Sequence, residues 1–233
     1  MAGFEATHVA LDLWRAVEAQ HRVATMVLVD TLDEQMLLER LLDEAKPAVP
    51  PAQRSLHWLL FTPFRYPPLP SGSRFRGPND PGVFYGAEEQ RTACAELGYW
   101  RWRLLMDSPA LKSIKPMQQT LFRTPVRGTA IDLRQPPLSG RRAQWTHTAD
   151  YRPCQDLASQ ARQEHIQIIR YESVRDPQAG ACAALLSHTA FAASEPSESQ
   201  MFMLAVFRHG VFWRLDSIFE ERAFVFDTSR WSS

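Results

Sequence analysis

The spacing of apolar residues changes along the chain, and the spacing in the N-terminal part predicts helices. We expect residues 8–45 to be mostly helical, because Leu11, Trp14 and Val17 follow a weak helical stripe. Prolines at 47, 50 and 51 then end this segment. Residues 1–50 are therefore expected to form a helical N-terminal extension, a separate cap or partner-binding element, before a main domain of residues 51–233. The stronger stripe in its second half is Leu32, Met36, Leu37, Leu41 and Leu42.

The middle of the chain predicts a short strand followed by a long helix. Residues 83–85 form an apolar run that ends at Gly86, and the turn-rich residues 77–82 precede it. Residues 88–106 show a helical pattern, with Glu96 at the edge of its apolar stripe. A carboxylate in that position is expected to be partly desolvated. The stripe consists of Ala93, Leu97, Trp100 and Leu104.

The second half alternates short apolar runs with turns. Runs at 129–133 and 167–171 are separated by a helical segment at 150–164. Residues 201–208 and 211–215 predict two strands joined as a hairpin at His209-Gly210. Few strong helices and many short strands favour an α+β fold over a doubly wound α/β fold.

Composition narrows the classes of function. Lys+Arg and Asp+Glu balance at 26 each, so the chain has no overall attraction for nucleic acid or an anionic membrane. No apolar run is long enough for a membrane-spanning helix, and the first residues lack the pattern of a secretion signal. Three separated cysteines fit a reducing compartment, so we expect a cytoplasmic protein. The balanced charge and the lack of a long apolar run lead us to expect no direct nucleic acid or membrane partner.

Common catalytic motifs are missing from the sequence. The seven histidines have no metal-site spacing, and no HExxH, GxSxG, GxGxxG or Walker sequence occurs. We therefore expect no metal site. The basic and aromatic residues at 99–103 fit RNA stacking, but on a helix they point in different directions, which favours core packing with a solvated face.

A polar set at equal intervals is the most informative feature. Arg74, Tyr85 and Glu96 are each eleven residues apart, and Ser173 follows far downstream. Arginines match phosphate oxygens, an aromatic ring packs on a planar base, and a carboxylate stabilises a developing sugar cation. A serine hydroxyl orients the sugar or an amide. Together these residue types suit an anionic dinucleotide.

Each residue also has a purely structural interpretation. Arg74 fits a solvated loop, Tyr85 fits the core at a strand end, and Ser173 fits a hydrogen bond to the backbone. Glu96 is harder to explain structurally, because a carboxylate near an apolar stripe costs free energy unless it has a task. Arg65 and Tyr66 lie between prolines and fit either a rigid turn or a phosphate-binding loop.

Four segments of the chain together resemble the RES domain family, which is named for its arginine, glutamate and serine. The resemblance covers roughly residues 56–220. Many compact members have Gly-Arg-Trp-Asn where this chain has Ser-Arg-Phe-Arg, which leaves the fine substrate contacts open. The segments are Ser73-Arg74-Phe75-Arg76, residues 81–88 (PGVFYGAE), residues 92–96 (TACAE) and residues 171–175 (YESVR).

The resemblance implies a fold, an activity and a partner. Members of this family are toxins of toxin–antitoxin pairs, with a mixed β-sheet core and flanking helices like those of ADP-ribosyltransferases. They degrade NAD, in some cases by phosphorolysis, so inorganic phosphate is expected as co-substrate and no cofactor beyond NAD. The expected partner is an Xre-type antitoxin. NAD hydrolysis, protein ADP-ribosylation and a non-catalytic nucleotide- or protein-binding module remain as alternatives.

The resemblance also assigns residues. Arg74, Tyr85, Glu96 and Ser173 match the family's arginine, aromatic, glutamate and serine, and are expected to be catalytic. Arg74, Tyr85 and Ser173 are also expected to bind NAD. Arg65-Tyr66 matches an earlier arginine–tyrosine contact, with Arg22 as the competing candidate for the first substrate-binding arginine.

Overall fold

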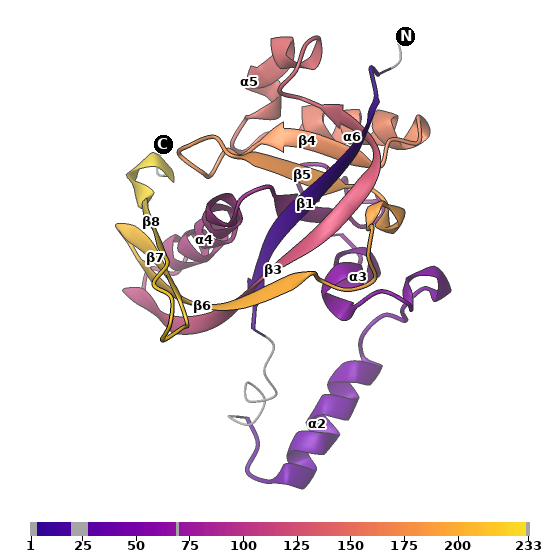
Figure 1. Ribbon diagram of the computed structural model, residues 1–233. Coiled ribbons are helices and arrows are strands. Elements are labelled where there is room, and N and C mark those ends of the chain that lie inside the picture. Colours follow the sequence, from indigo (N-terminus) through magenta and orange to yellow (C-terminus); the bar gives the residue numbers. More distant parts are fainter. Residues whose placement is uncertain (1–3, 20–27, 69, 232–233) are drawn as a thin grey trace.

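The structure is a computed structural model that describes residues 4–19, 28–68 and 70–231. Strands within these ranges form one mixed eight-stranded sheet in the order β1-β2-β5-β4-β3-β6-β7-β8. The expectation of an α+β fold with a mixed sheet and flanking helices is confirmed (Figure 1). The strands are β1 (Thr7–Glu18), β2 (Phe84–Ala87), β3 (Ser113–Asp132), β4 (Ile168–Glu172), β5 (Ala181–Leu185), β6 (Glu198–Phe207), β7 (Gly210–Leu215) and β8 (Ala223–Asp227).

Helices connect and cover these strands. Short 3-10 helices occur at Pro51–Gln53, Leu138–Arg141, His188–Ala190 and Thr228–Trp231. The predicted strand at 83–85, the helices at 88–106 and 150–164, and the hairpin at 201–215 are all confirmed. The α-helices are α2 (Leu32–Glu44), α3 (Trp58–Arg65), α4 (Gln90–Met106), α5 (Arg142–Trp145) and α6 (Arg152–Gln163).

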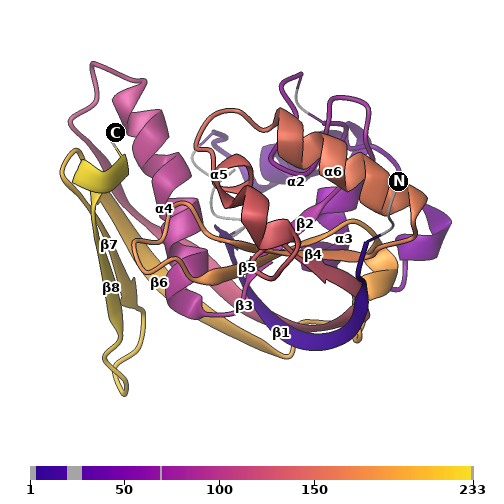
Figure 2. The same ribbon diagram turned by 90° about the horizontal axis from the view of Figure 1, so that it is seen from above.

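The sheet bends until β1 reaches β3. Besides its contact with β2, β1 pairs antiparallel with β3 along its whole length, from Thr7 opposite Ala130 to Glu18 opposite Gln119. Strands β1, β2, β5, β4 and β3 therefore form a closed ring, from which β6, β7 and β8 extend (Figure 2). The view from above shows α4 between the ring and the outer strands.

The helix predicted in the first part of the N-terminal extension is wrong. Residues 7–18 are β1, a strand of the main sheet. Val9, Leu11 and Leu13 alternate with polar or small residues, and this period of two fits a strand better than the weak helical stripe. Only the second predicted helix exists, as α2. The five residues of its predicted stripe are exposed, and Figure 1 shows the helix apart from the sheet.

Both faces of the sheet are buried. Neighbouring residues in a strand point to opposite faces, and the pairs Leu13–Trp14 and Ala183–Ala184 each divide between two apolar clusters. One cluster gathers residues of β1–β5 with α3, and the other gathers residues of the same strands with α4, α6 and β6–β8. The candidate site lies on the face that α4 covers.

The buried face of α4 differs from the predicted stripe. Ala93 is buried, but Trp100 and Leu104 are 53% and 51% exposed. The sheet contacts α4 instead through residues that include Gly98 and Trp102, and Gly98 lies where a Cβ would meet Val211 at 3.0 Å. Gly98 therefore lets α4 approach the sheet closely, and the predicted stripe is buried at Ala93 but exposed at Trp100 and Leu104.

Candidate functional site

A cavity of about 700 Å³ lies between the sheet, α4 and the segment that leads into α6. Arg74, Tyr85 and Glu96 all line it, so the structure brings together the three residues of the equal-interval set. Its volume falls in the range of roughly 300–1,000 Å³ typical of small-molecule sites. Its further polar or aromatic lining residues are Trp14, Arg15, Ser71, Ser73, Trp100, Asp150, Tyr151, Arg152, Gln155, Tyr171 and Arg175.

Arg74 stands at the tip of a tight turn. The backbone N–H groups of Ser73 and Arg76 donate to each other's carbonyl oxygens at 2.7 and 3.1 Å. Gly72 precedes this turn with φ +66°, and a Cβ there would lie 2.1 Å from the Arg76 carbonyl oxygen, so only glycine fits. Phe75 in the turn is fully buried and fixes the turn to the core. Arg74 is thereby directed inward.

The Arg74 side chain is buried and well held. Its Nη1 donates to the carbonyl oxygens of Trp145 and His147 at 2.8 and 3.0 Å. Its guanidinium lies 4.7 Å from the centre of the Tyr151 ring, a cation–π distance. A charge held by carbonyl dipoles and an aromatic face keeps its position in the cavity wall. This arrangement excludes the solvated-loop interpretation of Arg74.

Tyr85 supports the turn that carries Arg74. Its hydroxyl accepts a hydrogen bond from the Phe75 N–H at 2.9 Å and lies 2.7 Å from the Ser73 hydroxyl. Burial is the largest effect on Tyr85 and raises the pKa of its phenol. The phenol is therefore neutral at pH 7, and its hydroxyl positions the turn while its ring lines the cavity.

Glu96 and Ser173 are joined directly. The Ser173 hydroxyl donates to Glu96 Oε1 at 2.6 Å. Burial is the largest effect on Glu96 and raises the pKa of its carboxyl, while the hydrogen bond from Ser173 acts in the opposite direction. The charges of nearby arginines also lower this pKa, by less than burial raises it. Glu96 is thus a carboxylate in a poorly solvated position.

Ser173 is 2% exposed and is not among the residues that line the cavity. Its oxygen also accepts hydrogen bonds from the backbone N–H groups of Arg175 and Asp176 at 3.2 and 3.0 Å. The hydroxyl therefore links the turn after β4 to the middle of α4. This geometry places Ser173 behind Glu96, where it orients the carboxylate.

A second contact fixes the same turn to the start of α4. Thr92 donates its hydroxyl proton to Asp176 Oδ2 at 2.8 Å, and both residues are buried. Gly180 lies at this contact, and a Cβ on it would come within 2.0 Å of Thr92 Oγ1. The close approach of α4 and the turn requires glycine there. Glu96 and Ser173 are consequently carried by two segments that are tied together twice.

Arg175 is a site residue that the sequence did not single out by itself. It is 5% exposed, lines the cavity, and its Nη2 donates to the Thr148 carbonyl oxygen at 2.9 Å. Its guanidinium lies 3.6 Å from the centre of the Tyr99 ring. The signal was present, because Arg175 closes the segment Tyr171–Arg175 that carries Ser173. The Arg175 guanidinium is therefore held in the cavity wall by a carbonyl oxygen and an aromatic face.

Arg15 was missed because its strand was predicted as a helix. It lies on β1, and its Nη1 donates to the Tyr85 carbonyl oxygen at 3.1 Å. Among the described residues its other two guanidinium nitrogens make no hydrogen bond. Burial lowers the pKa of Arg15 to about 10, so it still carries a charge at pH 7. The Arg15 guanidinium carbon also lies 4.7 Å from the centre of the Phe84 ring, a cation–π distance. Arg15 therefore adds a positive charge to the lining of the cavity.

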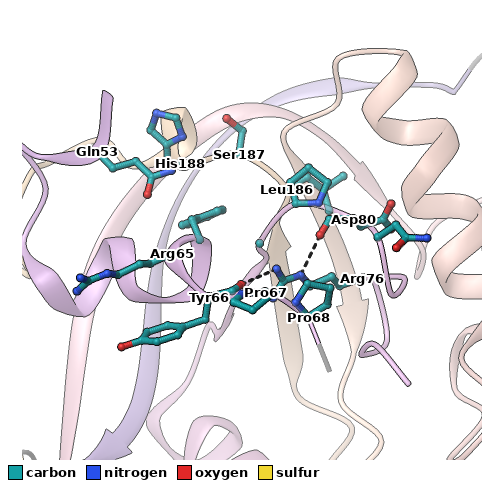
Figure 3. A pocket seen from close by; sticks show the side chains of 14 residues that line it. Gln53, Arg65, Tyr66, Pro67, Pro68, Arg76, Asp80, Leu186, Ser187 and His188 are labelled. Carbon is teal, nitrogen blue, oxygen red and sulfur yellow. Dashed lines mark hydrogen bonds between the residues drawn. The ribbon is translucent and has the colours of Figure 1, made fainter. Parts of the chain in front are cut away.

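Arg65 and Tyr66 lie at a different pocket. This pocket of about 580 Å³ shares no lining residue with the cavity that holds Arg74 and Glu96. Arg65 Nε donates to the Pro47 carbonyl oxygen, and Figure 3 shows the side chains of Arg65 and Tyr66 extending away from Arg76 and Asp80. The structure does not bring this pair to the predicted site. Arg22 lies outside the described residues.

The three cysteines, Cys94, Cys154 and Cys182, are free and buried. Cys182 lines the cavity, but burial raises the pKa of its thiol well above the usual value. A thiol of that kind is not a nucleophile at pH 7. Among the described residues, no group of three or more His, Cys, Asp or Glu side chains has the arrangement of a metal site. The same part of the chain contains no helix that meets the length and hydropathy needed to span a membrane.

Comparison with known proteins identifies the family. The sequence model of the RES domain matches residues 48–205, more than half of the chain, so the chain belongs to the RES domain family. Among solved structures it is similar to a chain of the M. tuberculosis MbcT–MbcA toxin–antitoxin complex, with 12% sequence identity and a TM-score of 0.49. That similarity covers 83% of this chain and 85% of the other. No curated protein matches the chain.

Proposed function

We propose that this protein is an enzyme that cleaves the bond between nicotinamide and ribose in NAD, and that its products are nicotinamide and ADP-ribose 1″-phosphate. The observation that carries the proposal is the charge pattern of the cavity. Three arginines, Arg15, Arg74 and Arg175, line the same space as the carboxylate of Glu96. The two other charged side chains of the lining form an ion pair with each other. Such an excess of fixed cations suits a diphosphate, and the partly buried carboxylate suits a cationic sugar.

Binding would use the arginines first. Arg15 has guanidinium nitrogens without partners among the described residues, and the planar fork of a guanidinium matches two phosphate oxygens. Arg74 is held rigidly by two carbonyl groups, so it would bind the same diphosphate with little loss of side-chain entropy. The rings of Trp14 and Trp100 at the cavity wall would pack on the planar bases.

Cleavage would use Glu96. As the bond from ribose C1″ to the nicotinamide nitrogen breaks, its electron pair goes to the nicotinamide ring and positive charge develops on the ribose. A carboxylate in a poorly solvated position stabilises that charge more strongly than one in water. Ser173 would hold the carboxylate at its place through the 2.6 Å hydrogen bond. Inorganic phosphate would then bond to C1″ through one oxygen, which completes a phosphorolysis.

Family membership favours a toxin function. We propose that loss of NAD in the cytoplasm arrests growth, and that an Xre-type antitoxin protein binds this chain and blocks the cavity. Both parts of this proposal are supported by the match to the RES domain over residues 48–205. Expression without an antitoxin should stop growth of the host, and expression of Glu96→Gln should not.

The direct test is incubation of the purified protein with NAD, with and without inorganic phosphate, followed by mass spectrometry of the products. Loss of NAD that requires phosphate and yields ADP-ribose 1″-phosphate supports phosphorolysis. Loss of NAD without phosphate indicates a hydrolase, and transfer of ADP-ribose to a protein indicates an ADP-ribosyltransferase. Survival of NAD under all conditions, with a folded protein, would reject the enzyme and leave a binding module.

A further inference from the structure

A cluster of aromatic rings lies directly behind Arg175. Trp231 belongs to the last 3-10 helix, Thr228–Trp231, and is 8% exposed. Its ring is perpendicular to the Tyr99 ring, with the ring centres 5.7 Å apart. It also contacts Trp102 and Phe226, at 5.8 and 6.0 Å between ring centres. The family match ends at residue 205, so Trp231 lies outside the segment that defines the family.

This cluster contacts Arg175 in two ways. The Trp231 indole N–H donates to the Arg175 carbonyl oxygen at 2.8 Å, which fixes the backbone of the turn. Tyr99 lies between Trp231 and the Arg175 guanidinium, 3.6 Å from ring centre to guanidinium carbon. Trp231 therefore holds the Arg175 backbone by a hydrogen bond, and it supports the Tyr99 ring that packs on the Arg175 guanidinium.

The hydrogen bond is not a requirement of ring packing. Trp213 lies in the same core, is 1% exposed, and its indole nitrogen has no hydrogen-bond partner among the described residues. This core thus accommodates a tryptophan without a partner for its N–H. The bond from Trp231 to Arg175 has a geometric effect of its own, since it fixes the carbonyl group two residues after Ser173.

We propose that Trp231 is a positioning residue that holds Arg175 in the wall of the cavity, so that the C-terminal segment completes an anion-binding site of the RES domain. The part of this inference that concerns substrate rests on the proposed function. The part that concerns the Arg175 side chain does not, because it follows from contacts within the protein. The two parts are measured separately.

Trp231→Phe is the test variant and Trp102→Phe is its matched control. Both changes keep a ring in the same cluster and remove an indole N–H. Trp102 donates to the Arg208 carbonyl oxygen at 3.0 Å, whereas Trp231 donates to Arg175. The first measurement is the NMR signal of the Arg175 guanidinium, assigned by its loss in Arg175→Lys. The second is the Kd for inorganic pyrophosphate, used as the probe.

In Trp231→Phe we expect the Arg175 signal to shift and broaden, and the Kd for pyrophosphate to rise about five- to ten-fold, as for the loss of one buried hydrogen bond. In Trp102→Phe, which keeps the hydrogen bond from Trp231 to Arg175 but also alters a ring that contacts Tyr99, the Arg175 signal and the Kd should both change less than in Trp231→Phe. In the wild-type protein the Trp231 indole proton should exchange slowly with solvent. This last measurement needs no variant and covers the case in which Trp231→Phe does not fold.

An unchanged Arg175 signal in Trp231→Phe would overturn the proposal, and so would equal changes in the two variants. Exchange of the Trp231 indole proton as fast as that of a free indole would also overturn it. A changed Arg175 signal in Trp231→Phe alone, in a protein that does not consume NAD, would uphold the positioning role and reject the proposed function.

Discussion

The Ser173 hydroxyl donates a hydrogen bond of 2.6 Å to the Glu96 carboxylate, and the two residues are 77 positions apart in the chain. Two of the three residue types that give the family its name are therefore in direct contact. Because Ser173 does not line the cavity, the contact indicates a division of tasks. Glu96 lines the cavity, and Ser173 holds the Glu96 carboxylate from behind.

Glu96→Gln should abolish turnover while leaving the fold intact. The amide keeps the shape of the side chain but removes the negative charge that would stabilise a ribosyl cation. We expect the rate of NAD consumption to fall about 100-fold or more. The measurement is the rate of NAD loss in proteins that circular dichroism shows to be folded. Full activity of a folded Glu96→Gln protein would contradict the assigned role.

The same substitution should not lower stability at pH 7. Burial raises the pKa of Glu96, so the ionised carboxylate is less favourable in the folded protein than in the unfolded chain. Protonated Glu96 makes its full contribution to the free energy of unfolding below the pKa of glutamate in the unfolded chain. That contribution is lost as the pH rises through the higher pKa of Glu96 in the folded protein. Glu96→Gln should therefore melt at an equal or higher temperature than wild type at pH 7. The difference should shrink toward pH 4, and a large destabilisation at pH 7 alone would contradict this reasoning.

Ser173→Ala should lower kcat more than it raises KM. The substitution removes the donor to Glu96, so the carboxylate is oriented less well, and no substrate contact is lost. We expect kcat to fall roughly ten-fold, as for a hydrogen bond to a charged group, with KM within about two-fold of wild type. The acid side of the pH–rate profile should move to higher pH, because the hydrogen bond from Ser173 lowers the pKa of Glu96. A rise in KM alone would indicate a direct contact with substrate.

Arg15→Ala should weaken binding of NAD. Arg15 lines the cavity, and two of its guanidinium nitrogens make no hydrogen bond to the described residues. Loss of a charge-assisted hydrogen bond to NAD would cost about 1.5–3 kcal/mol, which is roughly 10- to 100-fold in Kd. Binding is best measured by calorimetry in the Glu96→Gln protein, where NAD is not consumed. Arg127→Ala is the control, since Arg127 is an exposed arginine of β3 outside the cavity. Equal affinities for the two variants would remove Arg15 from the site.

Tyr85→Phe should destabilise the protein and disturb Arg74. The change leaves the buried N–H of Phe75 without its acceptor and removes the contact with the Ser73 hydroxyl. We expect a loss of about 1–3 kcal/mol in the free energy of unfolding, together with weaker NAD binding. Denaturant unfolding measures the first and calorimetry the second. Tyr66→Phe provides a comparison, because Tyr66 is 39% exposed and lies at the other pocket.

The sequence predicted the helices and strands whose signals are local. Residues 88–106 and 150–164 are regular helical patterns, and the hairpin turn at His209-Gly210 is a two-residue signal. The prediction for β1 was wrong because the strand with which it pairs, β3, lies more than one hundred residues away in the sequence. In residues 7–18 the alternating pattern typical of a strand covers only part of the segment, and a weak helical stripe overlaps it. Only the pairing of this segment with β3 decides in favour of a strand.

The site could be predicted only in part for a similar reason. The equal intervals and the family resemblance predicted Arg74, Tyr85 and Glu96 as site residues, and the structure brings these residues to one cavity. Arg15 and Arg175 carry no spacing signal of their own, because the closure of the sheet determines which distant arginines share a cavity. The apolar stripe on α4 was assigned to the core, yet Trp100 lies at the cavity wall. A planar ligand and a core both favour aromatic residues, so residue type alone does not distinguish them.

The closed ring of strands also affects how fast the protein becomes active. β1 is the first strand of the chain, and its ladder with β3 joins residues 7–18 to residues 119–130. Contacts between such distant segments form slowly, since the entropy of closing a long loop is lost before the contacts are gained. Arg15 reaches the cavity only after this step. A newly made chain should therefore lack Arg15 in the wall of its cavity until residues 7–18 have paired with residues 119–130.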